Sequence, residues 1–185
     1  MFTPTSYFQK VAAVLPAIPA EPVEQIIATL RQARANGQRV FVFGNGGSSA
    51  NASHIVNDMI KSTIQPGRPR MKLICLSDNV PTLTAYANDV GYESVFVEQL
   101  KNFAQVGDLV MAISGSGNSP NVLRAVEYAN SIGCRTLALT GRDGGKLGPL
   151  AQLNIQASEP HMGRIEEVHL TICHMIGYYF IDAEA

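Results

Sequence analysis

The chain has 185 residues, 46% of them hydrophobic, with 14 Lys and Arg against 15 Asp and Glu and a formal net charge of −1. A chain of this length buries roughly 70% of its extended surface, so one domain over residues 1–185 can fold without a disulfide or metal. The balanced charge argues against a nucleic-acid-binding domain, and the apolar content excludes a disordered chain.

The first 36 residues predict two helices. A short helix covers about residues 4–15, and prolines separate it from a second helix, with Pro22 suited to the first turn. Apolar residues then recur at helical spacing until Asn36-Gly37 ends the helix. The apolar stripe on these two helices is larger than is needed to cover one small sheet. We therefore expect residues 1–36 to serve in oligomerisation.

From residue 40 onward, short apolar runs alternate with helical patterns. The runs predict strands at 40–43, 72–76, 109–113, 136–139 and, more weakly, 153–156, and a closing helix at about 163–181. This alternation predicts an α/β fold with a parallel sheet covered by helices on both faces. The strand-to-helix loops of such a sheet open at one edge, so the Gly- and Ser-rich segments 44–49, 114–119 and 140–145 predict a binding cleft there.

Residues 114–119, Ser-Gly-Ser-Gly-Asn-Ser, carry the most information. The two glycines allow successive backbone N–H groups to face a ligand, and the three serines supply hydroxyls. Ser119-Pro120 is typical of a helix start, where N–H groups and the helix dipole favour an anion. No lysine follows as in a nucleotide-binding P-loop, so a single sugar phosphate fits better. A tight turn with a capping serine is the alternative.

The segment 44–49, Gly-Asn-Gly-Gly-Ser-Ser, is the second loop. Its three glycines allow the backbone to approach a ligand closely. Asn45 and Ser48 could form hydrogen bonds with sugar hydroxyls or phosphate. The pair of loops at one sheet edge is a stronger indication of a binding site than either loop alone.

The motifs GNGGS, SGSGNS and EEVHLTICH together resemble the sugar isomerase (SIS) domain, and most of all the phosphoheptose isomerases, over nearly the whole chain. The resemblance implies a three-layer αβα sandwich with a five-stranded parallel sheet and an N-terminal helical extension. It also implies a homotetramer with active sites at subunit interfaces. The implied reaction interconverts sedoheptulose 7-phosphate and glycero-manno-heptose 7-phosphate. By position, the residues implied to bind substrate are Asn45, Gly46, Ser48, Asp89, Ser114, Ser116, Asn118 and Ser119. Helix capping explains Asp89 equally well.

Histidines and carboxylates on two predicted helices are the candidate acid–base groups. His54 and Asp58 are four residues apart and therefore share one helix face. On the last helix, spacing alone favours Glu167 beside His174, whereas the family motif places a functional residue at position 166. The resemblance decides for Glu166, with Glu167 as the alternative.

An aldose–ketose isomerase needs a base at the carbon next to the carbonyl and a group that moves protons between the two oxygens. Imidazole and carboxylate groups are suited to both tasks. The family pair is a glutamate at position 58 and His174, but this chain has Asp58, which is one methylene shorter. It also has Glu166 where the isomerases usually carry glutamine. The base is therefore either Asp58 or Glu166, with His174 as its partner.

The same side chains could instead hold a metal. Some family members bind zinc at these positions, and His54, Asp58, Glu166 and His174 would give an acceptable zinc shell. A metal would polarise the carbonyl and stabilise the enediolate. The alternative is a surface pair of His54 and Asp58 on one helix.

The remaining polar residues receive less specific predictions. His169 is expected in the core, His161 in a loop, and Arg164 either against a substrate anion or in solvent. The competing function is a non-catalytic SIS module that binds a phosphosugar or a protein. A Rossmann oxidoreductase is disfavoured because no GxGxxG motif follows the first strand and no acidic residue ends the second at the ribose position.

The cysteines and the N-terminal sequence give information on the cellular compartment. No apolar run approaches the ~20 residues of a membrane span, and MFTPTSYFQK lacks the pattern of a signal peptide. The three cysteines, Cys75, Cys134 and Cys173, each lie in an apolar stretch. Buried thiols in the cytoplasm are predicted, with no membrane or nucleic-acid partner.

Overall fold

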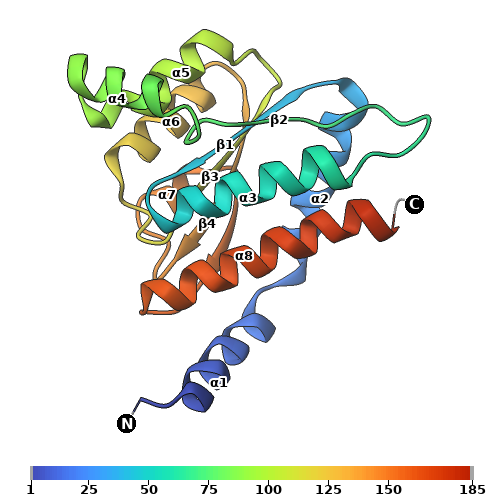
Figure 1. Ribbon diagram of the computed structural model, residues 1–185, viewed down its shortest axis with the longest axis vertical. Helices are drawn as coiled ribbons and strands as arrows, with labels where there is room; N and C mark the ends of the chain where they lie inside the picture. The colour runs from blue at the N-terminus through green and yellow to red at the C-terminus, as the bar shows by residue number, and fades with distance from the viewer. Residues whose placement is uncertain (1, 184–185) are drawn as a thin grey trace.

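A five-stranded parallel sheet forms the centre of the computed structural model (Figure 1). The structure describes residues 2–183, so Met1, Glu184 and Ala185 at the ends of the predicted domain lie outside it. The strands lie in the order β2-β1-β3-β4-β5. Their bounds are β1 (Arg39–Gly44), β2 (Lys72–Cys75), β3 (Leu109–Ser114), β4 (Arg135–Gly141) and β5 (Leu153–Ala157). The predicted fold class is confirmed.

Helices cover both faces of this sheet. The helices of the described residues are α1 (Pro4–Val14), α2 (Ala20–Asn36), α3 (Gly47–Ser62), α4 (Val80–Asp89), α5 (Val95–Phe103), α6 (Pro120–Ser131), α7 (Leu147–Leu150) and α8 (Met162–Tyr178), and all but α1 lie on the sheet or beside it. Short 3-10 turns lie at Leu15–Ala17 and Tyr92–Ser94, and a π-helical turn at Tyr179–Ala183 extends α8. Buried residues of α2, α3 and α8 pack on one face, and those of α5 and α6 on the other.

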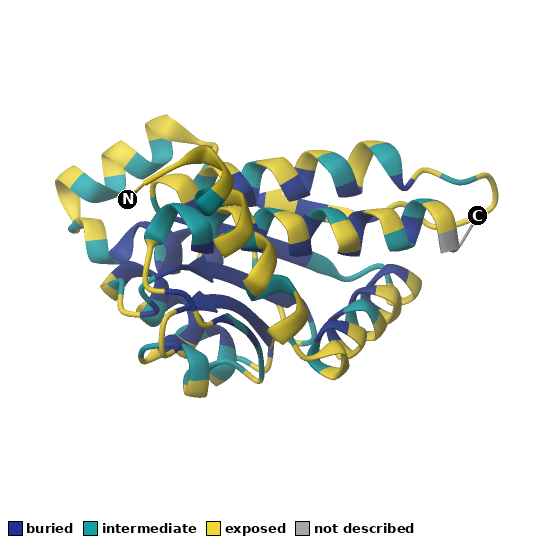
Figure 2. Ribbon diagram, turned by 90° about the horizontal axis from the view of Figure 1, so that it is seen from below, coloured by how far each residue is buried: buried dark blue, intermediate teal, exposed yellow. Residues whose placement is uncertain are grey.

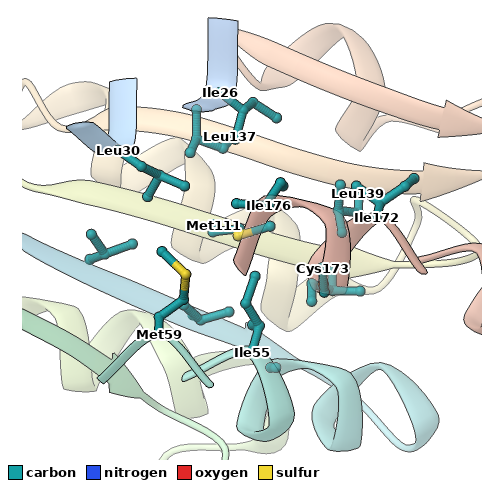
Figure 3. Close-up of a cluster of buried hydrophobic side chains, with 14 of the residues drawn as sticks. Ile26, Leu30, Ile55, Met59, Met111, Leu137, Leu139, Ile172, Cys173 and Ile176 are labelled. Atoms are coloured by element: carbon teal, nitrogen blue, oxygen red, sulfur yellow. The ribbon is translucent and has the colours of Figure 1, made fainter. Parts of the chain in front are cut away.

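The two covered faces of the sheet explain the continuous apolar runs in β1 and β3. Val40 and Val42 of β1 face the core under α2, α3 and α8, while Phe41 and Phe43 face the opposite core. Successive strand residues point to opposite faces, so a sheet covered on both sides needs an apolar residue at every position. Figure 3 shows the first core, where Met111 of β3 lies among side chains from α2, α3 and α8.

The three cysteines are free and buried, as predicted. Burial raises the pKa of Cys75 to about 12, of Cys134 to about 11 and of Cys173 to about 12. These thiols therefore stay protonated at neutral pH and are poor nucleophiles.

Helix α1 has no buried residue although it is 11 residues long. Figure 1 shows it standing outside the body formed by the sheet and its covering helices, and Figure 2 shows the exposed and half-buried residues along it. Phe2 and Phe8 are 80% and 68% exposed. Among the described residues no single helix is long and apolar enough to cross a membrane; residues 4–17 and 20–36 pass that test only as a pair bent by 73°.

Helix α3 starts earlier than predicted. Gly46, with φ +55°, is its N-cap, so Ser48 and Ser49 belong to the first helical turn rather than to the loop. Ser49 donates its backbone N–H to the Gly46 carbonyl at 3.0 Å, which closes this turn. The polar residues after β1 thus sit on a rigid helix start.

Candidate active site

The strand order places a topological switch point, called the crevice below, between the loops after β1 and β3. The chain leaves β1 toward β2 on one side and returns to β3 on the other, so the two loops diverge at this switch point. Ligands of open parallel sheets bind at such points. A Cβ at Gly44 would lie 2.7 Å from the Ile113 carbonyl oxygen, so only glycine permits the close approach of the two strand ends.

The loop after β3 is folded tightly by its own hydrogen bonds. The Gly117 N–H donates to the Ser114 carbonyl at 3.1 Å and to the Ser114 hydroxyl at 3.2 Å. Gly117 has φ +64°, and a Cβ there would collide with the Gly144 carbonyl. Ser119 is the N-cap of α6 as predicted, but its hydroxyl makes no capping hydrogen bond. Serine hydroxyls and a helix N-terminus therefore meet in one loop, an arrangement suited to a phosphate.

Asn118 connects this loop to the turn after β4. Its amide donates to the Ser116 carbonyl at 2.9 Å, and its side-chain oxygen accepts the Lys146 N–H at 3.2 Å. Asn118, which was predicted to contact the substrate, therefore forms hydrogen bonds within the loop and to the neighbouring turn. Ser116 and Asn118 also line an open depression of about 660 Å³.

The loop after β1 carries Asn45, and here the structure adds two residues that the sequence did not single out. Asn45 forms two reciprocal amide hydrogen bonds with Asn121 of α6, each 2.9 Å long. The Tyr92 hydroxyl also donates to Asn45 Oδ1 at 2.9 Å. Their only sequence signal was their nearness to predicted loops, with Asn121 directly after Ser119-Pro120.

The other predicted substrate contacts lie around the same edge. Ser48 is buried in the first turn of α3, and Gly46 before it is exposed. Asp89 ends α4, where its carboxylate accepts a hydrogen bond from Asn88 at 2.7 Å. Asp89 is three residues before Tyr92, the residue that reaches Asn45.

Two histidines and an aspartate meet across α3 and α8. His54 Nε2 lies 2.8 Å from His174 Nε2 and 3.2 Å from Asp58 Oδ2, and His174 Nε2 lies 3.8 Å from that oxygen. The side chains are 44%, 41% and 27% exposed for His54, His174 and Asp58. The spacing on α3 placed His54 beside Asp58, and the packing of α8 on α3 brings in His174.

This cluster could hold a metal ion. One ligand atom from each of His54, Asp58 and His174 lies within 4.8 Å of the others. Two imidazoles and a carboxylate suit a divalent transition metal, and three protein ligands leave a position open for water or substrate. Three of the four predicted ligands form this group, and Glu166, the fourth, lies outside it, so the four-ligand set stays a prediction.

Glu166 and Glu167 point to different neighbours. The Glu166 carboxylate lies against Gly47 at the start of α3, where an added Cβ would overlap it. Asn51 of α3 donates to the Glu166 backbone carbonyl at 2.9 Å. The Glu167 carboxylate instead accepts the Tyr7 hydroxyl of α1 at 2.9 Å. Between these two carboxylates, the one at position 166 faces the loop after β1.

The remaining polar residues of the last helix have structural partners. His169 is buried as predicted, with Nε2 2.9 Å from the Thr140 carbonyl, and burial lowers its pKa. Arg164 forms an ion pair with Glu159 and stacks on Tyr7 at 5.8 Å. The hydrogen bond from Arg164 lowers the pKa of Glu159. His161 is the exposed N-cap residue of α8.

Comparisons with known proteins agree with this arrangement. The family model of the SIS domain matches residues 6–141. A phosphoheptose isomerase of Pelobacter propionicus is 37% identical over 91% of this chain and 87% of its own length. A probable phosphoheptose isomerase of Thermoplasma acidophilum is 39% identical over 83% and 86%. The structure of the Neisseria gonorrhoeae phosphoheptose isomerase aligns with TM-score 0.88 at 30% identity, covering 95% of each chain. This chain therefore belongs to the SIS domain family, among the phosphoheptose isomerases.

Proposed function

We propose that this chain is a sugar-phosphate isomerase that interconverts sedoheptulose 7-phosphate and the corresponding aldose, glycero-manno-heptose 7-phosphate. The relatives named phosphoheptose isomerase support the reaction and the substrate class. The observation that carries the proposal is the meeting of His54, Asp58 and His174, because a module that only binds a phosphosugar needs no such acid–base group. The serine loop at 114–119 and the start of α6 are the proposed phosphate site.

The proposed chemistry is proton transfer through an enediol. A base removes the proton from the carbon next to the carbonyl and returns it to the neighbouring carbon, while a second group moves a proton between the two oxygens. We assign the second task to His174. Of the two candidate bases we choose Glu166, because its carboxylate faces the loop after β1, whereas Asp58 lies 3.2 Å from His54. Asp58 then orients His54.

As the alternative to proton transfer by His174, we propose that His54, Asp58 and His174 hold zinc, because an imidazole nitrogen that binds a metal cannot also carry a transferred proton. When bound, the metal would polarise the substrate carbonyl and stabilise negative charge on the enediolate oxygen. Metal analysis of the purified protein tests this assignment. We expect about one zinc per chain, and loss of that zinc in His54→Ala with the fold retained by circular dichroism. Equal zinc content in the two proteins would contradict the assignment.

The isomerase proposal is tested by hydrogen exchange. The protein is incubated with sedoheptulose 7-phosphate in D₂O, and other C5 to C8 ketose phosphates are run in parallel. Deuterium should enter at the carbon next to the carbonyl, and His174→Ala should lower the rate by about 10²–10⁴-fold. Binding without exchange by metal-loaded protein would support a phosphosugar-binding module instead.

The assembly proposed is a homotetramer in the cytoplasm. Helix α1 has no buried residue and exposes Phe8, so a neighbouring subunit would give it a partner. An apolar depression of about 430 Å³ lies nearby between the α1–α2 connection and α8, with Leu15, Ile18 and Met175 in its lining. The three free cysteines accord with a reducing compartment.

A further inference from the structure

The reciprocal amide pair joins the two loops of the crevice. Asn121, the second residue of α6, is 2% exposed, and Asn45 is the first residue after β1. We propose that Asn121 is a positioning residue that fixes the amide of Asn45, so that Asn45 offers the substrate an N–H donor and no acceptor. This inference rests on the proposed function, in which Asn45 contacts the phosphosugar.

A backbone group determines how both amides are turned. The Val122 N–H donates to the Ser119 carbonyl at 3.1 Å and also to the side-chain oxygen of Asn121 at 3.0 Å, and a backbone N–H can only donate, so an amide NH2 group in that place would be repelled. The atom that it meets must therefore be Asn121 Oδ1, which leaves Asn121 Nδ2 to face Asn45 Oδ1 at 2.9 Å. Asn45 Nδ2 then faces Asn121 Oδ1, also at 2.9 Å. The start of α6 thus fixes the orientation of a side chain on the neighbouring strand end.

The hydrogen-bonding capacity of Asn45 follows from this orientation. An amide oxygen accepts two hydrogen bonds, and Asn45 Oδ1 receives one from Asn121 and one from the Tyr92 hydroxyl at 2.9 Å. An amide nitrogen carries two hydrogens, and Asn121 takes one of them. Only the second N–H of Asn45 remains for a ligand.

A single N–H donor at this position can bind only a substrate atom that accepts a hydrogen bond. It can bind a carbonyl oxygen or one with negative charge, and it gives no acceptor to a hydroxyl proton. Two substrate atoms have that character: a phosphate oxygen, and the oxygen that becomes negative as the enediolate forms. A phosphate contact would be made in the ground state and would change KM, whereas an enediolate contact would change kcat.

The test separates this role from simple support of α6. Asn121→Asp keeps an oxygen for the Val122 N–H and for Asn45 Nδ2, and an acidic residue in the first turn suits the helix dipole. Its second oxygen, however, faces Asn45 Oδ1 where a donor stood, so the two oxygens repel and Asn45 must turn. The variant therefore keeps the helix start and removes only the fixed orientation.

The steady-state kinetics with sedoheptulose 7-phosphate are compared for the unchanged protein, Asn121→Asp, Asn45→Ala and the double variant. Each single change should lower kcat/KM by about 10- to 100-fold, the scale of one hydrogen bond to a charged group. The double variant should be no slower than Asn45→Ala, because Asn121 acts through Asn45. Additive losses would show a separate structural role and overturn the inference.

Asn130→Asp is the matched control. Asn130 lies on α6 near its other end, where its amide donates to the Leu150 carbonyl at 3.0 Å and accepts from Thr136 at 2.7 Å. The Asn130→Asp substitution also replaces an amide by a carboxylate on α6, but at a position away from the crevice. We expect kcat/KM to stay unchanged in this variant even if the melting temperature falls.

A readout without turnover distinguishes this inference from the proposed function. In protein labelled with ¹⁵N-asparagine, one of the two Nδ2 protons of Asn45 should exchange slowly with solvent, and Asn121→Asp should abolish that protection. If the unchanged protein shows no isomerisation, the proposed function fails and the amide resonance still decides the inference. Retained protection of the Asn45 amide in Asn121→Asp would refute it.

Discussion

Gly47→Ala tests whether Glu166 acts as the catalytic base from the position of its carboxylate beside Gly47. Gly47 is the first residue of α3, and its φ is not in the left-handed region, so alanine can adopt its backbone. The new Cβ would overlap the carboxyl group of Glu166, whereas non-bonded carbons settle at about 3.5–4.0 Å. The carboxylate must therefore move by more than about 1 Å.

The expected result is a loss of rate without a loss of stability. The displaced group is the end of a flexible side chain, so its movement costs little, and alanine in place of glycine favours a helix by up to about 1 kcal/mol. A catalytic group that is misplaced by about 1 Å lowers the reaction rate on the order of 10²-fold. We therefore expect kcat to fall about 10²-fold while the melting temperature is kept or rises slightly.

The assay is isomerisation of sedoheptulose 7-phosphate beside thermal unfolding. Gly177→Ala on α8 is the control, because the nearest atom to its Cβ is Met59 Sδ at 4.0 Å, an ordinary contact. Its kcat should not change. Glu166→Gln keeps the size and removes the base, so kcat should fall by about 10²–10⁴-fold, and adding Gly47→Ala should change it little further. Full kcat in Gly47→Ala would refute Glu166 as the base and favour Asp58.

Three further outcomes are expected. Replacing Ser114 and Ser116 together by alanine should weaken phosphosugar binding at least 10-fold, since each hydrogen bond to a charged group contributes ~1.5–3 kcal/mol; unchanged affinity in calorimetry would remove the phosphate assignment. Burial lowers the pKa of His169 below its usual value of about 6.5, so the unfolded chain binds more protons below that pH. Stability should therefore be kept above about pH 6.5 and fall by up to about 1.4 kcal/mol per pH unit below it, and thermal melts of His169→Gln should show a flatter slope. Phe8→Asp should shift the protein from a tetramer to smaller species in light scattering, with Gln9→Asp as the control; a monomeric unchanged protein at micromolar concentration would count against the tetramer.

The layout of the sheet and its loops could be predicted from the sequence. Continuous apolar runs are what a sheet covered on both faces requires, and Phe41 and Phe43 alternate with Val40 and Val42 between two cores. Glycine marked the loops because positions such as Gly117 have left-handed backbone and no room for a Cβ. These signals are local, and a parallel sheet brings such loops to one edge.

Spacing on one helix predicted half of the histidine cluster. His54 and Asp58 share a face because they are four residues apart, and their contact of 3.2 Å follows from that. The contact of His54 with His174, 120 residues away, depends on how α8 packs against α3. No periodicity within either helix contains that information.

The choice between Glu166 and Glu167 was also made by tertiary packing. Helix geometry alone favoured Glu167, which shares a stripe more closely with His174. The structure turns Glu167 toward Tyr7 of α1 and Glu166 toward Gly47 of α3. Neighbouring residues on a helix point about 100° apart, so the rotation of α8 between its two partners decides which one faces the start of α3.

The sequence by itself determined the fold class, the two glycine-rich loops and the polar residues that they carry, because each follows from periodicity or from local backbone freedom. Only the tertiary structure joined Asn45 to Asn121 and Tyr92, and brought His174 to His54 and Asp58. These contacts span up to 120 residues of chain, and they form where rigid elements pack with side chains directed at one another.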